Sequence, residues 1–162
     1  MVIGLTKIFV FSDSHGCSAN MSKVLRKEVP DMIIFLGDGE VDLESLKHSY
    51  PKIRIHSVRG NCDIYSSSAG FLILSAPPRK IFATHGHTYG VKIDPSLEKL
   101  VTAAFEKEAD ILLFGHTHVP FTDYRMGMEI LNPGTIGNVE NPTYGEVIID
   151  GFKLRTAIKK VV

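Results

Sequence analysis

The sequence predicts an α/β fold in which two facing mixed β-sheets are flanked by helices. Before Asp123, short apolar runs with the composition of buried strands alternate with helical patterns, which is typical of strands joined by helices. After Asp123 the chain contains only strand candidates separated by turns. An α/β part followed by a β-rich part fits two sheets that pack face to face with the helices outside.

The first elements follow from short β-branched or aromatic runs and from helical periodicity. Apolar residues recur near helical spacing after the first strand, and Pro30 ends this helix. A second, shorter helix is expected at residues 41–48. The strands of this region are expected at residues 7–11, 32–36 and 53–58.

The remaining elements include a predicted hairpin, which indicates that the sheets are not purely parallel. A Pro-Pro turn separates two strands expected at residues 70–75 and 79–84. A helix is then expected with Pro95 at its first position and Ala109 at its end. The last strands are expected at residues 111–114, 123–126, 128–131, 144–150 and 152–158.

Length and composition favour one globular domain over residues 1–162. With 44% hydrophobic residues, a chain of this length buries roughly 70% of its unfolded surface. Lys plus Arg equals Asp plus Glu at 18 each, so no global positive field attracts a nucleic-acid polymer. There is no leader pattern and no apolar run long enough for a membrane span, so a cytoplasmic protein without membrane contact is expected. Two cysteines do not make a disulfide framework.

Five apolar runs each end in residues that commonly bind metals. These runs are KIFVFSDSH, MIIFLGD, IHSVRGN, KIFATHGH and ILLFGHTH. Ligands of α/β sheets bind beyond the carboxyl ends of the strands, so donors far apart in sequence converge if the strands are neighbours. Oxygen and nitrogen donors gathered on one rim imply metal. The predicted ligands are Asp13, His15, Asp38, Asn61, His85, His116 and His118.

The spacing of these donors predicts two metal sites that share Asp38, because each carboxylate oxygen can take one metal. The donor pairs in DSH and HTH are two residues apart, which in an extended segment puts both side chains on one face. Glycine beside every cluster permits sharp turns and close backbone approach. This mixed ligation without thiolate suits Mn, Fe, Ni, Co or Zn better than Ca or Mg. One site consists of Asp13, His15, Asp38 and His118, and the other of Asp38, Asn61, His85 and His116.

The motifs DSH, GD, GNCD, HGH and GHTH, in this order, resemble the signature of the calcineurin-like metallophosphoesterase superfamily. The resemblance covers the chain from about Lys7 to Val119, and LNPGTIG at 131–137 is similar to the turn that follows in the small prokaryotic phosphodiesterase branch. It implies a four-layer α/β/β/α sandwich and a dinuclear centre with the ligands named above. The expected cofactors are two divalent transition-metal ions, with Mn favoured and Ni, Co, Fe or Zn as alternatives.

The function expected from this resemblance is a metal-dependent phosphodiesterase that hydrolyses a small phosphodiester through a hydroxide bridging the two metals. Asp38 and Asn61 then belong to the catalytic centre. Many members of the superfamily carry His where this chain has Cys62, and a thiol is a weak proton donor. We therefore expect better turnover of esters with acidic leaving groups. His87 is a second candidate acid or phosphate contact.

Two other functions stay open at the level of sequence. One is a phosphomonoesterase of broad specificity, because a dinuclear core does not choose between monoesters and diesters. The other is a protein-interaction scaffold like the retromer subunit, which resembles this branch but has a degraded metal site. The presence of all seven donors favours an enzyme. Arg59 either holds a phosphate oxygen or forms a surface ion pair, and a homo-oligomer is left open.

Overall fold

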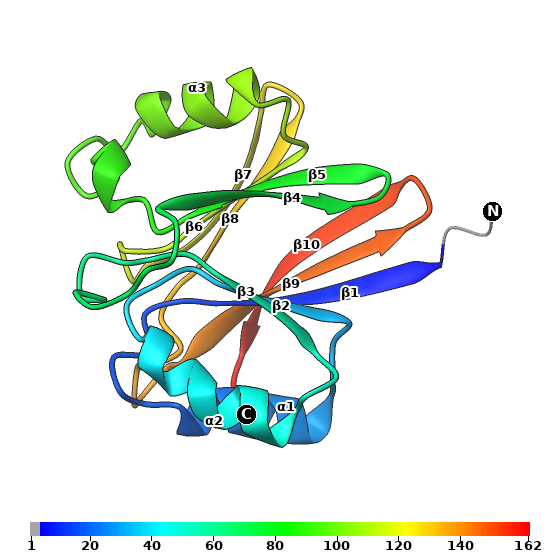
Figure 1. The fold of residues 1–162 in the computed structure, drawn as a ribbon. Coiled ribbons are helices and arrows are strands. Elements are labelled where there is room, and N and C mark those ends of the chain that lie inside the picture. The colour runs from blue at the N-terminus through cyan, green and yellow to red at the C-terminus, as the bar shows by residue number, and fades with distance from the viewer. Residues whose placement is uncertain (1–3) are drawn as a thin grey trace.

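The computed structural model describes residues 4–162 as two five-stranded sheets that face each other between outer helices (Figure 1). The first sheet has the order β10-β9-β1-β2-β3. Its strands are β1 (Leu5–Phe11), β2 (Met32–Phe35), β3 (Arg54–Ser57), β9 (Thr143–Asp150) and β10 (Lys153–Lys160). The second sheet has the order β4-β5-β6-β8-β7. Its strands are β4 (Phe71–Ala76), β5 (Arg79–Thr84), β6 (Ile111–Phe114), β7 (Pro120–Arg125) and β8 (Met128–Pro133).

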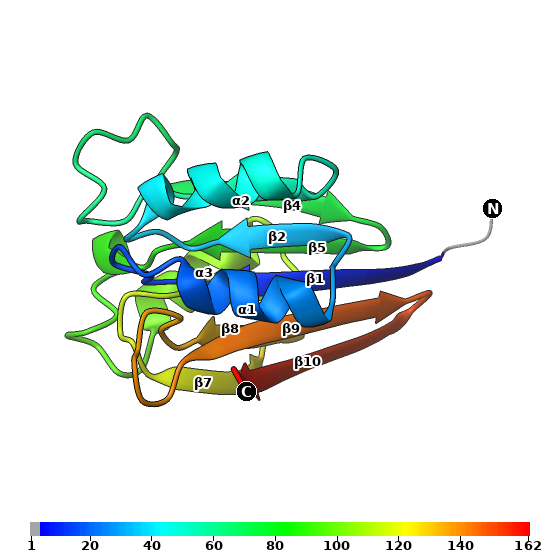
Figure 2. The ribbon, with the colours of Figure 1, turned by 90° about the horizontal axis from the view of Figure 1, so that it is seen from below.

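Helices cover the outer face of each sheet, which confirms the predicted fold class (Figures 1 and 2). Helices α1 (Ala19–Lys27) and α2 (Leu43–Ser49) lie on the first sheet, and α3 (Glu98–Glu106) lies on the second. Two short 3-10 helices, η1 (Glu40–Asp42) and η2 (His87–Tyr89), lie in loops that follow strands. Among the described residues, no helix combines the length and apolarity needed to cross a membrane.

Both sheets are mixed, as the predicted hairpin required. In the first sheet β1, β2 and β3 are parallel, whereas β9 runs antiparallel to β1 and to β10. In the second sheet β5, β6 and β8 are parallel, and the edge strands β4 and β7 are antiparallel to their neighbours. The parallel strands place their carboxyl ends at the same end of the molecule.

The predicted β-rich carboxyl third is confirmed, and its strands are divided between the two sheets. Strands β7 and β8 complete the second sheet, whereas β9 and β10 return to the first, where β9 pairs with β1 and β10 pairs with β9. The physical reason is that β1 has two edges, and β9 satisfies the backbone groups on the edge that β2 leaves free. The first sheet therefore draws strands from both ends of the chain, and the second consists of the consecutive strands β4 to β8 from its middle.

Strand β1 shows how alternating side chains contribute to two of the three core clusters. Ile8 and Val10 point into the cluster between the two sheets, and Phe9 and Phe11 point into the cluster under α1 and α2. All four side chains are fully buried. A third cluster packs α3 against the second sheet. Because β1 is covered on both faces, its sequence is a continuous apolar run rather than an alternating one.

Helix α3 begins at Glu98 and ends at Glu106, so the prediction of a helix from Pro95 to Ala109 is wrong at both ends. The Asp94 carboxylate accepts hydrogen bonds from the backbone N–H and the hydroxyl of Ser96, at 2.9 Å and 2.6 Å. These bonds close a tight turn at the place where the first turn of the helix was predicted. Leu97 and Glu108 then have φ values of 58° and 55°, and left-handed residues interrupt a helix.

Candidate metal centre

The predicted donors lie in the loops that follow β1, β2, β3, β5 and β6, at the end where these loops gather in Figure 1. Asp13 and His15 have φ values of 57° and 46°, and His116 and His118 have values of 68° and 62°. The expectation of extended backbone at these pairs is therefore wrong. The chain must turn sharply where it leaves the sheet, and left-handed residues make that turn. The paired side chains nevertheless reach a common point.

Asp13, His15 and His118 form the first group of donor atoms. His118 Nε2 lies 3.1 Å from Asp13 Oδ1 and 3.3 Å from His15 Nε2, and His15 Nε2 lies 3.7 Å from Asp13 Oδ1. Asp13 is fully buried, and within residues 4–162 its Oδ1 has no hydrogen-bond partner. A buried carboxylate oxygen without a donor is costly unless a cation satisfies it. This arrangement fits a divalent metal.

His85 is the centre of the second group. Its Nε2 lies 3.1 Å from Asn61 Oδ1, 3.1 Å from His116 Nδ1 and 3.3 Å from Asp38 Oδ2. Its Nδ1 lies 2.6 Å from the carbonyl oxygen of Leu36, which can only accept. The proton is therefore on Nδ1, and the Nε2 lone pair faces the other donors. A carbonyl partner that sets the tautomer is typical of metal-binding histidines.

Asp38 lies between the two groups. Its ligand atoms come within 4.8 Å of those of His85 and His116 on one side, and of His15 and Cys62 on the other. The side chain is almost fully buried, and its Oδ1 accepts a 2.7 Å hydrogen bond from the backbone N–H of Cys62. The structure thus brings all seven predicted donors to one place, with one carboxylate in the middle.

His87 lies beside the second group but outside it. Its ring centroid is 5.3 Å from that of His85 and 6.1 Å from that of His116. Within the described chain, its buried Nδ1 has no hydrogen-bond partner. His48 and His56 lie in α2 and β3, away from the cluster, as expected.

The environment keeps the key side chains neutral. Burial, reinforced by the neighbouring His85, lowers the pKa of His116 to about 4, so its imidazole offers a lone pair at pH 7. Burial also lowers the pKa of His87. Burial, followed by the hydrogen bond and charge of Asp38, raises the pKa of Cys62, so this thiol is protonated near neutral pH. A protonated thiol is neither a strong metal ligand nor a nucleophile.

A family model described as the calcineurin-like phosphoesterase superfamily domain matches residues 6–150. The chain belongs to this superfamily. Among curated relatives, it is 31% identical over 130 residues to the probable metallophosphoesterase YsnB of Bacillus subtilis, with 80% of this chain and 74% of the relative covered. It is 25% identical over 159 residues to the phosphodiesterase YfcE of Escherichia coli, with coverage of 82% and 80%. The family expected from the motifs is thus confirmed.

Solved structures share the fold of this phosphoesterase. A predicted phosphoesterase from Streptococcus pneumoniae superposes with a TM-score of 0.79 at 30% identity, covering 97% of this chain and 90% of that one. Vps29 from Entamoeba histolytica in complex with zinc superposes with a TM-score of 0.72 at 20% identity, covering 96% and 99%. At this identity, the second likeness shows the fold alone.

Asp63 is a site residue that the sequence reasoning missed, although it ends the quoted GNCD motif. Its carboxylate accepts hydrogen bonds from the backbone N–H groups of Asp38, Gly39, Glu40 and Gly60, over 2.7–3.1 Å. Burial alone would raise its pKa, but these bonds prevail and lower it. The sequence did contain a signal for this role. Asp63 is a carboxylate within a motif of predicted ligands, yet it was not itself assigned as a ligand.

Asn132 is a second missed residue, in the LNPGTIG segment of the phosphoesterase. Its side-chain amide donates to the Gly115 carbonyl at 3.0 Å and to the Thr117 hydroxyl at 2.9 Å, and it is fully buried. Further along, the Thr135 hydroxyl donates to the Asp13 carbonyl at 2.8 Å. The segment therefore braces both ligand loops of the first group.

Glycine is required where the loops after β2 and β3 cross. A Cβ on Gly60 would lie 2.1 Å from Asp38 Oδ1, and one on Gly37 would lie 2.5 Å from the Gly60 nitrogen. No side chain fits at either position unless the backbone moves. The expected close backbone approach is confirmed here.

Arg59 is exposed and, within residues 4–162, forms no ion pair. Of its two expected roles, the surface ion pair is therefore wrong.

Proposed function

We propose that this protein is a metal-dependent phosphodiesterase whose centre holds two divalent transition-metal ions, Mn²⁺ being favoured. The observation that carries the proposal is the pair of donor groups that meet at Asp38. A buried acceptor without a donor at Asp13 and the fixed tautomer of His85 both support metal binding. The phosphodiesterase YfcE is a relative, which supports the reaction class.

The proposed ligands are those that the motifs predicted. Asp13, His15 and His118 would hold the first ion, Asn61, His85 and His116 would hold the second, and Asp38 would contribute to both. These donors are imidazole, carboxylate and amide, which together suit Mn, Fe, Ni, Co or Zn. The protonated Cys62 is not part of this set.

When bound, two such metals activate a water molecule as nucleophile, orient the phosphoryl group and offset the charge that develops on its oxygens. The protein supplies the fixed geometry. The Ser12 hydroxyl and the His116 backbone N–H both contact Asp13 Oδ2, at 2.5 Å and 3.1 Å, which turns Oδ1 toward the histidines. Leu36 and Cys62 orient His85 and Asp38 in the same way, through their backbone groups.

Proton transfer to the leaving group is the weak part of this centre. Cys62 lies next to Asp38, where a thiol with a raised pKa is a poor acid. His87 lies close enough to the second group to contact a phosphoryl oxygen, but its lowered pKa leaves it neutral at pH 7. We therefore infer a preference for diesters whose leaving groups are already acidic.

The experiment compares bis(4-nitrophenyl) phosphate with 4-nitrophenyl phosphate after the protein has been stripped with chelator. Mn²⁺, Ni²⁺, Co²⁺, Zn²⁺ and Mg²⁺ are added back separately. Restored hydrolysis of the diester supports the proposal, and restored hydrolysis of the monoester alone favours the phosphomonoesterase. If neither ester is hydrolysed, the result favours the protein-interaction scaffold. The variant His85→Ala should abolish activity, whereas His48→Ala, an exposed histidine of α2, should retain it.

A further inference from the structure

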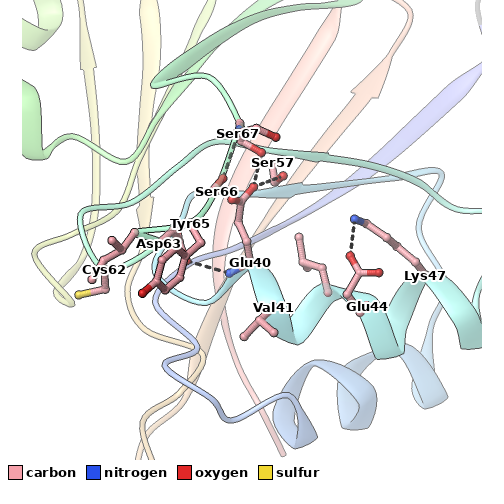
Figure 3. Close-up of a pocket in the computed structure, with 13 residues that line it drawn as sticks. Glu40, Val41, Glu44, Lys47, Ser57, Cys62, Asp63, Tyr65, Ser66 and Ser67 are labelled. Atoms are coloured by element: carbon pink, nitrogen blue, oxygen red, sulfur yellow. Dashed lines mark hydrogen bonds and ion pairs between the residues drawn. The ribbon is translucent and has the colours of Figure 1, made fainter.

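A cavity of about 510 Å³ opens beside Cys62, between the start of α2 and the loop of residues 62–68 (Figure 3). Figure 3 shows Cys62 at one end of the lining residues and Lys47 at the other. Because Cys62 N–H also holds Asp38, the cavity begins at the edge of the proposed metal centre. Its volume lies within the range of about 300–1,000 Å³ that is usual for small-molecule sites.

One wall of the cavity carries an acidic acceptor with unused capacity. Glu40 Oε1 accepts hydrogen bonds from the hydroxyls of Ser57 and Ser68, at 2.6 Å and 2.5 Å. Within residues 4–162, Oε2 of the same carboxylate has no hydrogen-bond donor. Two hydroxyls therefore hold Glu40 in position while its second oxygen stays free to accept from a ligand.

The mouth of the cavity carries apolar side chains that are largely exposed in the described part of the chain. Val41 and Ile64 are 77% and 79% exposed, and Tyr65 is 100% exposed. Single exposed apolar residues are common on protein surfaces, but three of them around one cavity form a patch. An unpacked tyrosine ring presents a flat face on which another ring can stack.

The charges of the cavity disfavour an anionic occupant. Among the described residues that line the cavity, Lys47 is the only cation, and it is already paired with Glu44 at 3.0 Å. Both oxygens of the Asp63 carboxylate already accept hydrogen bonds, from four backbone N–H groups in total. Glu40 is left as a negative hydrogen-bond acceptor, so a neutral group rich in hydroxyls suits this wall.

We propose that this cavity binds the nucleoside part of a nucleotide phosphodiester, with the base on Tyr65 and the ribose hydroxyls on Glu40. The inference rests on the proposed phosphodiesterase function, because the phosphoryl group would lie on the metal centre next to Cys62. A carboxylate is a common partner of a ribose hydroxyl, and bases of any sequence stack on aromatic rings. The substrate class is thus a small nucleotide diester. The zero net charge of the chain agrees with this, because it provides no positive field to attract a nucleic-acid polymer.

The first test detects the nucleoside without any hydrolysis. Saturation-transfer NMR is recorded with adenosine on chelator-treated protein. The wild type should transfer signal to the base protons, and Tyr65→Phe should keep this transfer while Tyr65→Ala loses most of it. Tyr124→Ala is the matched control, because Tyr124 is an exposed tyrosine of β7 that does not line the cavity. Equal transfer in Tyr65→Ala and wild type, or none in either, overturns the proposal.

The second test uses two diesters with the same leaving group. The 4-nitrophenyl ester of uridine 5′-phosphate, which carries both ribose hydroxyls, should have a kcat/KM at least about tenfold above that of methyl 4-nitrophenyl phosphate, a difference of about 1.4 kcal/mol. Tyr65→Ala should remove this advantage, whereas the control Tyr124→Ala, outside the cavity, should keep the rates of both esters. Equal rates for both esters in the wild type refute the subsite while the phosphodiesterase stands. Hydrolysis of neither ester refutes the phosphodiesterase, and the NMR result then decides the subsite alone.

Discussion

The Asp63 carboxylate accepts a 2.7 Å hydrogen bond from the backbone N–H of Asp38. The same oxygen accepts a 2.8 Å bond from Gly60, whereas the other oxygen binds the N–H groups of Gly39 and Glu40. One side chain therefore joins the loop after β2 to the loop after β3. Because these loops carry Asp38 and Asn61, Asp63 acts as a positioning residue for two proposed metal ligands.

Replacing Asp63 by Asn should destabilise the protein by about 2–3 kcal/mol, since charge-assisted hydrogen bonds are lost and an amide NH₂ would face backbone donors. Urea unfolding measures the change, and elemental analysis should find less bound metal. Asp123→Asn is the control, because this partly exposed carboxylate on β7 pairs with Arg125 alone among side chains of the described residues. Equal stability of the Asp63 variant and the wild type would refute the positioning role.

Replacing Gly60 by Ala should displace the loop after β3. The new Cβ would lie 2.1 Å from Asp38 Oδ1 and 2.4 Å from the Asp38 nitrogen, so the backbone must move. We expect a cost of about 1–3 kcal/mol and loss of metal binding. Thermal unfolding and metal content are the measurements. Gly70→Ala is the matched control, because its Cβ would meet no atom within 4 Å; equal effects of the two variants would contradict the prediction.

Replacing Asp38 by Asn should weaken both metals together, because the side chain shared by the two donor groups loses its charge. An at least tenfold lower affinity for each ion, about 1.4 kcal/mol, is the expected result. Titration with Mn²⁺ followed by calorimetry measures it. If the stoichiometry is unchanged and the affinity falls for one ion only, Asp38 is not a ligand shared by the two ions.

Replacing Cys62 by His should supply the missing proton donor. In the wild type, rates should fall steeply as the pKa of the leaving group rises, because the thiol is a weak acid. The variant should hydrolyse alkyl esters at least about tenfold faster and show a shallower dependence, since general acids contribute about 10²–10⁴-fold. A series of aryl and alkyl diesters makes the comparison, and parallel slopes for the two proteins would count against this role.

The sequence by itself determined the strands, the pool of donors and the superfamily. These features are local, because a buried strand shows itself in a short apolar run and a donor in its residue type. KIFVF became β1, ILLF became β6, and DSH and GHTH supplied the donors at their ends. The order of the motifs along the chain then sufficed to indicate the phosphoesterase family.

Only the tertiary structure decided which strands share a sheet, how the donor loops turn and what holds them. Strand β9 pairs with β1 across more than half of the chain, a pairing that no local pattern encodes. The left-handed backbone at Asp13 and His15 depends on N–H bonds to the Gly37 and Asp38 carbonyls of another loop. The role of Asp63 likewise lies in its four backbone partners rather than in its own residue type. These contacts are non-local, and their free energy exists only once the two sheets have packed together.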